Sequence, residues 1–523
     1  MMKGDSFIMG KLKMGWSEID ITPDKKISLA GQFAERISEY VEKPLTATAL
    51  AIEADGEQLV MVSADAPSIS HKVMVRVREL LADNKEGLDP EKVIISAIHT
   101  HTGYAPGGGQ RTREGQSIMS SWKDLLLSML KPGQKYIESA PVSESPEIAT
   151  PAECFEIATT RFAKVALEAW KNRKAGCSFA NAFDRAAVGM CRRVGYSDNT
   201  AQMWGNANTA VFTEVEGGND SGVELLFCFD EKKELEGVVV NLACPAQCVQ
   251  HRLFVSPDFW GETKKILRER FGEKIFMLPL CSAAGDQCPV DLVRWVNPDT
   301  DVHDPNLIRN NPPVRKADPS MFDLEGMRKA GKRVANAVFD AGDDAEGKFE
   351  LQEDVKFEHQ IHNMQLPLRR CTLTEYNDSV KALKDYVRSK EGDIDYNDVA
   401  NLQKYLGIIQ RYDLQEKVET LDTEIHIIRL GSIAIATNPF EPFLDYGNQI
   451  KARALCEQTF LIQLCCGAEG YLPTAKAEPH GHYSAFIASG QCGHEGGDLL
   501  VRETLKFVNG MFQDDYKVYE YQE

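Results

Sequence analysis

The sequence contains no long apolar run. A membrane-spanning helix needs about 18 consecutive apolar residues or more, whereas the longest apolar segments here, 223–230 and 237–244, have the length of strands. Residues 1–20 also lack the apolar core and the small-residue cleavage site of a secretory signal peptide. We therefore expect neither a membrane span nor export.

Positive charge is in deficit. The chain of 523 residues carries 59 Lys and Arg against 78 Asp and Glu, which gives a formal charge of −19. Proteins that coat nucleic acid draw much of their affinity from clustered Lys and Arg, so this composition argues against a nucleic-acid partner. With 43% apolar and 26% charged residues, the chain is typical of a folded globular protein.

Cysteine is present without the pattern of a disulfide framework. The chain has 13 cysteines, an odd number, at irregular spacing. In the absence of an export signal, this favours reduced thiols in a cytoplasmic protein. We expect most of them to be small buried hydrophobic residues.

The hydrophobic pattern predicts an α/β fold with mixed sheets flanked by helices. Residues 47–64 read as a hairpin, 70–83 as a helix and 92–98 as a further strand. This order predicts a βαβ crossover, and ligands of such sheets bind at the carboxyl ends of strands. Asp65 and His99 stand at two such ends.

The rest of the chain continues in the same manner, without a sequence repeat. Further strands are expected at 223–230, 236–244, 274–281, 349–366, 423–436 and 458–466, and helices at 154–173, 263–271, 374–389, 396–414, 440–455 and 499–512. A long loop or lid is expected over 291–320. We expect one body over 14–512, with a smaller α+β portion at 345–430.

The strongest local signal is the segment 96–103, Ser-Ala-Ile-His-Thr-His-Thr-Gly. His99 and His101 are two residues apart, so both lie on the same side of a regular strand. Either imidazole is a candidate metal ligand. Two polar residues at a strand end are an equally plausible interpretation of so short a motif.

Four further clusters place polar residues in a tight turn after an expected strand. They are Asn-Leu-Ala-Cys-Pro at 241–245, Ala-Gly-Asp-Gln-Cys-Pro at 284–289, Asn-Pro-Phe-Glu-Pro at 438–442 and Gly-Tyr-Leu-Pro-Thr at 470–474. Each alone is more typical of a structural turn. Together with the two histidines they offer His, Cys, Glu and Tyr, which suit a borderline-soft metal such as zinc.

The order and spacing of these motifs resemble the catalytic domain of the neutral/alkaline, non-lysosomal ceramidases, a family of zinc-dependent amidases. The resemblance extends over roughly 14–512 and includes His-Gly-His-Tyr at 480–483. It implies a neutral-ceramidase-like fold of mixed sheets flanked by helices. It also implies a zinc ion bound by His99, Glu441 and Tyr471.

The same resemblance implies a set of residues around the substrate. His101 matches the second histidine of the motif, which contacts substrate in the family, and Tyr483 matches a second tyrosine beyond the zinc ligand. The family also has an Arg directly after an Asn near the reacting amide. Here Cys191 precedes Arg192, so Arg192 is a candidate for that role.

The chain departs from the family pattern at two central positions. The second zinc histidine of the family lies in a His-Pro element, whereas this chain has Cys244 before a proline; Cys244 is a candidate ligand, and His251 is the other. Cys288 stands where the family has its active-site serine, as either a nucleophile or, as we favour, a packed replacement. Because only 513–523 follow the last expected helix, no C-terminal immunoglobulin-like domain is expected.

These features predict a zinc-dependent hydrolase of an amide or similar carbonyl in a small polar substrate, with homo-oligomerisation possible. One rival is a metal-dependent enzyme that acts on a sugar derivative, as a lyase, isomerase or glycoside-cleaving enzyme, with Asp65, Asp258 and Asp286 as acid/base groups. The other is a binding protein whose catalytic site has degenerated at Cys244 and Cys288. The loop histidines are expected to face solvent; they are His480, His482 and His494.

Overall fold

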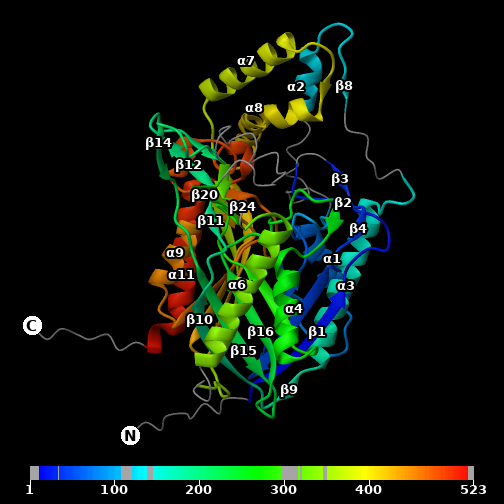
Figure 1. Cartoon of the computed structure of the whole chain (residues 1–523), viewed down its shortest axis with the longest axis vertical. Helices are drawn as coiled ribbons and strands as arrows, with labels where there is room; N and C mark the ends of the chain where they lie inside the picture. The colour runs from blue at the N-terminus through cyan, green and yellow to red at the C-terminus, as the bar shows by residue number, and fades with distance from the viewer. Residues whose placement is uncertain are drawn as a thin grey trace, which may run out of the picture.

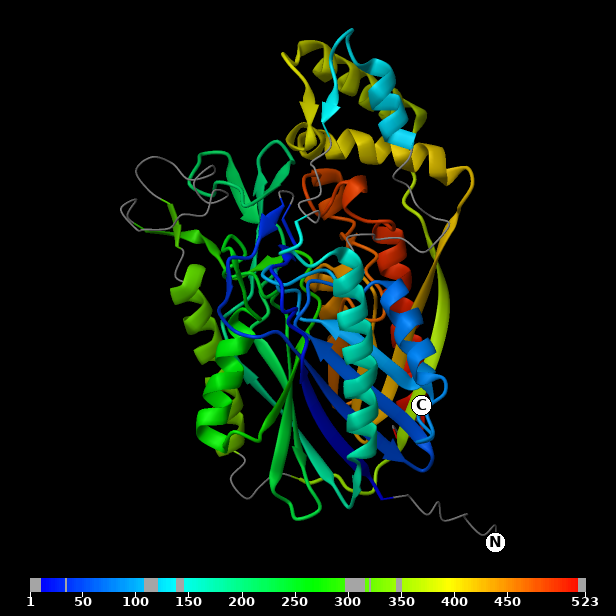
Figure 2. The same cartoon turned by 90° about the vertical axis from the view of Figure 1, so that its right-hand side faces the viewer.

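Three mixed β-sheets form the body of the protein (Figures 1 and 2). The computed structural model describes residues 11–32, 35–107, 121–137, 145–296, 316–318, 321–344 and 350–515. The strand orders are β7-β6-β5-β1-β9, β10-β15-β16-β18 and β22-β24-β25-β27. In the first sheet the strands are β1 (Lys13–Asp20), β5 (Thr46–Ala54), β6 (Glu57–Ala64), β7 (Val93–Ala97) and β9 (Lys174–Ala175). In the second they are β10 (Ser178–Arg185), β15 (Gly222–Phe229), β16 (Leu235–Leu242) and β18 (Phe276–Cys281), and in the third β22 (Phe357–Pro367), β24 (Thr420–Leu430), β25 (Ile433–Thr437) and β27 (Gln458–Ile462).

The three sheets repeat one topology. In each, a first strand pairs antiparallel with a hairpin, and the second hairpin strand pairs in parallel with a strand that follows a helix. The crossover helices are α1 (His71–Leu81), α4 (Phe259–Phe271) and α9 (Leu444–Arg453). The helices that cover the sheets after these parallel strand pairs are α3 (Pro151–Lys171), α6 (Asp323–Asp344) and α11 (His494–Phe512). The predicted βαβ unit at 58–98 is the first of three. The repetition lies in the topology, because the sequence itself shows no repeat.

The inner faces of the three sheets share one apolar core. Leu50 of the first sheet, Leu226 of the second and Ile428 of the third belong to it, and all are at most 1% exposed. Burial of each such side chain stabilises the fold by about 1.5–3 kcal/mol. The outer faces are covered by helices: α1 and α3 on the first sheet, α4 and α6 on the second, α9 and α11 on the third.

Local sequence determines where α3 begins. At α3, Thr150 Oγ1 accepts a hydrogen bond from Glu153 N at 3.1 Å, and the Glu153 carboxylate accepts one from Thr150 N at 2.8 Å. This capping box satisfies backbone donors of the first turn. The helix then buries Phe162 and Val165, which are 0% exposed, against the first sheet.

The parallel strand pairs end close together. After the second sheet, Ser282 N donates to Leu242 O at 2.9 Å, and the third sheet joins it where Gln463 N donates to Cys281 O at 3.0 Å. The third sheet reaches the first where Cys466 N donates to Ile95 O at 2.9 Å. Turns from all three sheets therefore meet at one end of the body, where ligands of α/β folds usually bind.

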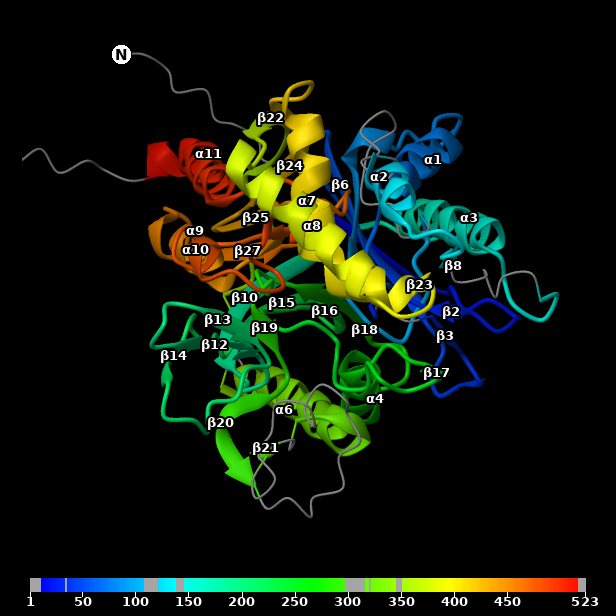
Figure 3. The same cartoon turned by 90° about the horizontal axis from the view of Figure 1, so that it is seen from above.

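A small helical lobe stands above that end (Figures 1–3). It contains α2 (Ser121–Met129), α7 (Leu373–Ser389), α8 (Tyr396–Gln415) and the parallel pair β8 (Tyr136–Ile137) and β23 (Ile394–Asp395). Its own core includes Leu126, Leu383 and Leu406. The described part of 345–430 thus divides, because β22 and β24 lie in the third sheet whereas α7 and α8 lie in the lobe.

Several predicted elements differ from the structure; the strand expected over 349–366, for example, begins only at Phe357. The ends of the expected loop at 291–320 pair as β20 (Asp291–Val296) and β21 (Lys316–Asp318), while 297–315 and 319–320 lie outside the described residues. The helix expected from 440 begins only at Leu444, since 441–442 form a short strand. The strand expected over 458–466 ends at Ile462, because the residues after it turn to positive φ, 50° at Leu464 and 57° at Cys466.

Two further expectations concern the membrane and the cysteines. None of the described helices combines the length and the hydropathy needed to cross a bilayer. All 13 cysteines lie in described residues, none forms a disulfide, and all but Cys456 are buried. The expectation that most of the cysteines are buried is therefore confirmed.

Candidate functional site

His99 lies two residues after the end of β7, and its φ of 63° turns the chain sharply away from the strand. Its Nδ1 lies 2.6 Å from Pro67 O, and its Nε2 lies 3.2 Å from Glu441 Oε2. A carbonyl oxygen can only accept, so Nδ1 carries the hydrogen. The Nε2 lone pair then faces a carboxylate oxygen, and a proton or a metal cation is needed between these two acceptors.

Glu441 is held opposite Tyr471. Glu441 begins β26 (Glu441–Pro442), which pairs in parallel with β28 (Tyr471–Leu472), and the two residues are partners in the register. Gly285 packs directly on this ladder: its N donates to Pro442 O at 2.9 Å, and a Cβ at position 285 would lie 2.2 Å from Glu441 O. Only glycine fits there, which explains the Ala-Gly-Asp sequence at 284–286.

Arg192 connects Tyr471 to Tyr483. It is 4% exposed, and its Nη2 donates to Gly285 O at 2.8 Å and to Tyr471 Oη at 3.2 Å. The rings of Tyr471 and Tyr483 meet edge to face with centroids 5.5 Å apart. Burial, reinforced by Glu441 and Tyr483, raises the pKa of the Tyr471 phenol well above its usual range, and Arg192 opposes this shift. Among the described residues, the buried Nε of Arg192 has no hydrogen-bond partner.

His101 is a neutral imidazole that accepts through Nε2. Its Nδ1 lies 3.2 Å from Gln250 Oε1, and Gln247 Nε2 donates to its Nε2 at 3.1 Å. Burial lowers the pKa of His101 well below its usual range, and His99 and Arg36 lower it further. Its ring meets that of His99 at 5.0 Å.

Two supports of these side chains were not anticipated from the sequence. Arg193 forms a buried ion pair with Glu216, and it donates to Tyr483 O at 2.9 Å and to Gly481 O at 2.8 Å, so it fixes the segment that carries Tyr483. Gln247 and Gln250 hold His101. Their spacing of three residues behind Pro245, in Pro-Ala-Gln-Cys-Val-Gln, is the signal that could have identified them.

The structure brings six of the candidate residues together: His99, His101, Arg192, Glu441, Tyr471 and Tyr483. Cys244 follows β16 by two residues and is 0% exposed in an apolar cluster. Its Sγ, His99 and Glu441 do not form a group whose ligand atoms all lie within 4.8 Å of one another. His251 stacks on Phe322 at 5.2 Å and lies 3.5 Å from Asp323.

Cys288 lies in an apolar cluster beside this group. It is 0% exposed, and its Sγ donates to Val290 O at 3.5 Å. Burial raises the pKa of the Cys288 thiol to about 12, although a backbone hydrogen bond with Val290 and the nearby Arg192 act in the opposite direction. The thiol is therefore protonated at neutral pH.

The three aspartates near the motifs all accept backbone hydrogen bonds. Asp65 accepts from Thr46 N at 2.7 Å and lines a separate cavity of about 440 Å³. Asp258 accepts from Val249 N and Phe259 N, at 2.9 and 2.6 Å, and Asp286 accepts from Leu444 N at 2.9 Å.

The three loop histidines that were expected to face solvent also have polar partners. His480 pairs with Glu216 at 2.8 Å, His494 pairs with Glu478 at 2.9 Å, and His482 Nδ1 accepts from Met203 N at 3.1 Å.

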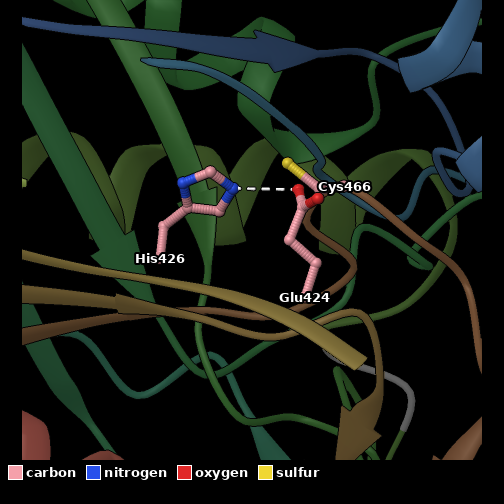
Figure 4. A group of neighbouring side chains, drawn as sticks. All are labelled: Glu424, His426 and Cys466. Atoms are coloured by element: carbon pink, nitrogen blue, oxygen red, sulfur yellow. Dashed lines mark hydrogen bonds and ion pairs between the residues drawn. The ribbon is translucent and has the colours of Figure 1, made fainter. Parts of the chain in front are cut away.

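A second group with metal-ligand chemistry was not predicted. The ligand atoms of Glu424, His426 and Cys466 all lie within 4.8 Å of one another (Figure 4). The sequence signal was available, since Glu-Ile-His at 424–426 places two ligand types on one side of a strand.

Comparison with solved structures identifies the fold. Neutral ceramidase from Pseudomonas aeruginosa matches with a TM-score of 0.64 and 15% identity, over 97% of this chain and 75% of that one. A structure described as "Ceramidase complexed with C2" matches with a TM-score of 0.63 and 14% identity, over 97% of this chain and 76% of the other. The chain has the neutral ceramidase fold.

The predicted fold class is therefore confirmed. No family model and no curated protein matches the sequence. Since the ceramidase fold is shared at such low identity, what the site does must follow from its own residues.

Proposed function

We propose that this protein is a zinc-dependent hydrolase of an amide, or of a similarly polarised carbonyl, in a small polar substrate. The contact between His99 Nε2 and Glu441 Oε2 at 3.2 Å carries this proposal, since two acceptors face each other there with Tyr471 beside them. A cation satisfies both. The ceramidase fold, which supports a hydrolase, agrees with it.

His99, Glu441 and Tyr471 would hold the metal. Three protein ligands and one open position are typical of catalytic zinc sites. A bound zinc ion would polarise the substrate carbonyl and lower the pKa of a water molecule to about 7. The apolar surroundings of Cys244 and the Asp323 contact of His251 do not favour either residue as a fourth ligand.

The remaining residues of the group would bind the substrate and its developing charge. Arg192 Nε is a buried donor without a partner among the described residues, a situation that costs about 1–3 kcal/mol. A substrate oxygen at Arg192 would remove this cost. Tyr483 would donate to the developing oxyanion. His101 donates through Nδ1 to Gln250, so its Nε2 could serve the substrate only as an acceptor, in exchange for the hydrogen bond from Gln247.

The alternatives receive less support from these contacts. The three aspartates that a sugar-cleaving enzyme would use already accept backbone hydrogen bonds. A polar lining of Arg192, His101 and Gln247 fits a small polar substrate better than ceramide. The 13 unpaired cysteines favour a reducing, cytoplasmic location.

Two histidine variants test the proposal. The His99→Ala variant should lose one equivalent of metal per chain by elemental analysis, and at least a thousandfold in hydrolysis of a panel of short N-acyl amines. The His251→Ala variant removes a histidine outside the group and should keep both. Full metal retention by His99→Ala, or turnover of a parallel glycoside panel alone, would refute the proposal.

A further inference from the structure

Glu424, His426 and Cys466 form a buried cluster that shares no residue with the proposed active site. Glu424 and His426 lie on β24 and point toward Cys466, which follows β27 (Figure 4). His426 is 0% and Cys466 4% exposed, and the Glu424 side chain is 12% exposed. His426 Nε2 lies 3.0 Å from Glu424 Oε1.

A chain of hydrogen bonds determines which nitrogen of His426 carries its hydrogen. His359 Nδ1 lies 2.9 Å from Gln58 O, so it donates there, and His359 Nε2 is left to accept from His426 Nδ1 at 2.9 Å. The lone pair of His426 Nε2 then faces the Glu424 carboxylate. As at His99, the contact requires a proton or a metal cation.

Each of the three candidate ligands also has a further contact that fixes its position. Arg78 donates to both Glu424 oxygens, at 2.7 and 3.0 Å. Cys466 is fixed at φ 57° by its N–H, which donates to Ile95 O at 2.9 Å, and Cys465 Sγ lies 3.8 Å from Cys466 Sγ. Outer contacts of this kind orient the ligands of protein metal sites.

We propose that Glu424, His426 and Cys466 bind a second divalent ion of the zinc class. One carboxylate oxygen, one imidazole nitrogen and one thiolate are the mixed donor set that zinc accepts. On binding, the one proton between His426 Nε2 and Cys466 Sγ goes to solvent, which leaves a neutral imidazole, a thiolate and a carboxylate as ligands. The ion ties β24 to the turn after β27, which is itself hydrogen-bonded to β7. It therefore joins the third sheet to the first.

Cobalt substitution in the His99→Ala background tests this site separately from the active site. A thiolate ligand gives Co²⁺ a near-ultraviolet charge-transfer absorption that a His, Glu and Tyr site lacks. The metal-free His99→Ala chain should bind one Co²⁺ with this absorption. Adding Cys466→Ser should abolish the absorption and weaken Co²⁺ binding at least a hundredfold. Adding Cys244→Ser, at another fully buried cysteine, should change neither.

Two results would overturn the proposal. One is a His99→Ala chain that binds no Co²⁺. The cluster would then be an ion pair of the His426 imidazolium and the Cys466 thiolate, without metal. The other is an absorption that depends on Cys244 instead of Cys466. Should Cys466→Ser fail to fold, X-ray absorption on the zinc-loaded His99→Ala chain decides: one sulfur ligand is expected, and a shell without sulfur contradicts the site.

Discussion

At the scale of single residues, two histidines share one arrangement. His99 and His426 each donate through Nδ1, to a carbonyl and to an imidazole respectively, and each presents Nε2 to a glutamate at 3.2 and 3.0 Å. Fixing one nitrogen in this way is how proteins select the tautomer of a metal-binding histidine. The shared contact pattern is why both positions are assigned a cation.

Cys288 should behave as a packing residue. With its pKa raised to about 12 by burial, the thiol has almost no thiolate at neutral pH and is shielded from reagents. Iodoacetamide should not label Cys288 in the folded protein, as judged by mass spectrometry, and should label it after unfolding in urea. Cys288→Ser should keep turnover within about tenfold, which corresponds to ~1.4 kcal/mol. Rapid labelling of the native protein, or a collapse of turnover with metal still bound, would show that the sulfur attacks.

Gly31 should be needed to seat His101. Gly31 has φ of 92°, and a Cβ at that position would lie 2.3 Å from His101 Cγ. Gly31→Ala should therefore lower turnover at least tenfold by displacing the imidazole, while the metal content is unchanged. Gly56→Ala is the matched control, since Gly56 also has positive φ, 83°, but meets nothing within 4 Å. Both variants carry a backbone cost of about 1–2 kcal/mol, so an equal loss of turnover in the two would contradict the seating role.

At the scale of elements, α4 begins at Asp258, a buried carboxylate whose ionised form is disfavoured. Asp258, 1% exposed, caps the helix and accepts from Val249 N and Phe259 N. Burial raises the pKa of Asp258 to about 6, although these hydrogen bonds oppose the shift. Because the folded-state pKa lies above the unfolded value of about 3.9, this group favours folding most below that value, and the contribution is lost as pH rises to about 6.

The free energy of unfolding should report this directly. The Asp258→Asn variant has no carboxyl at this position to titrate. Compared with that variant, the free energy of unfolding of the wild type should fall by up to roughly 3 kcal/mol between pH 4 and pH 7. Urea unfolding of both proteins across that range measures the difference. A difference that does not change with pH would mean that Asp258 is ionised in the folded state throughout.

The sequence predicted elements well where periodicity alone defines them. The hairpin at 47–64 and the helix at 374–389 were found because alternation and helical spacing are local properties. The helix at 440–455 was placed too early because pairing of Glu441 with Tyr471 across the chain outweighs local helical preference. Such pairing is a tertiary effect that no local pattern contains.

At the scale of the whole molecule, one arrangement of strands occurs three times and brings the candidate residues to one place. His99 follows β7 of the first sheet, Gly285 follows β18 of the second, and Glu441 follows β25 of the third. Because these three residues follow strands of different sheets, the sequence pattern of one sheet cannot predict that they lie together. The family resemblance supplied their association, whereas Arg193, which holds the segment of Tyr483, became visible only in the structure.

Anomalous X-ray diffraction at the zinc absorption edge, from crystals grown with zinc, tests the central claim most directly. The account predicts an anomalous peak in contact with His99 Nε2, a Glu441 carboxylate oxygen and Tyr471 Oη. An absent peak there, or one held by His251 or Cys244 instead, would contradict it.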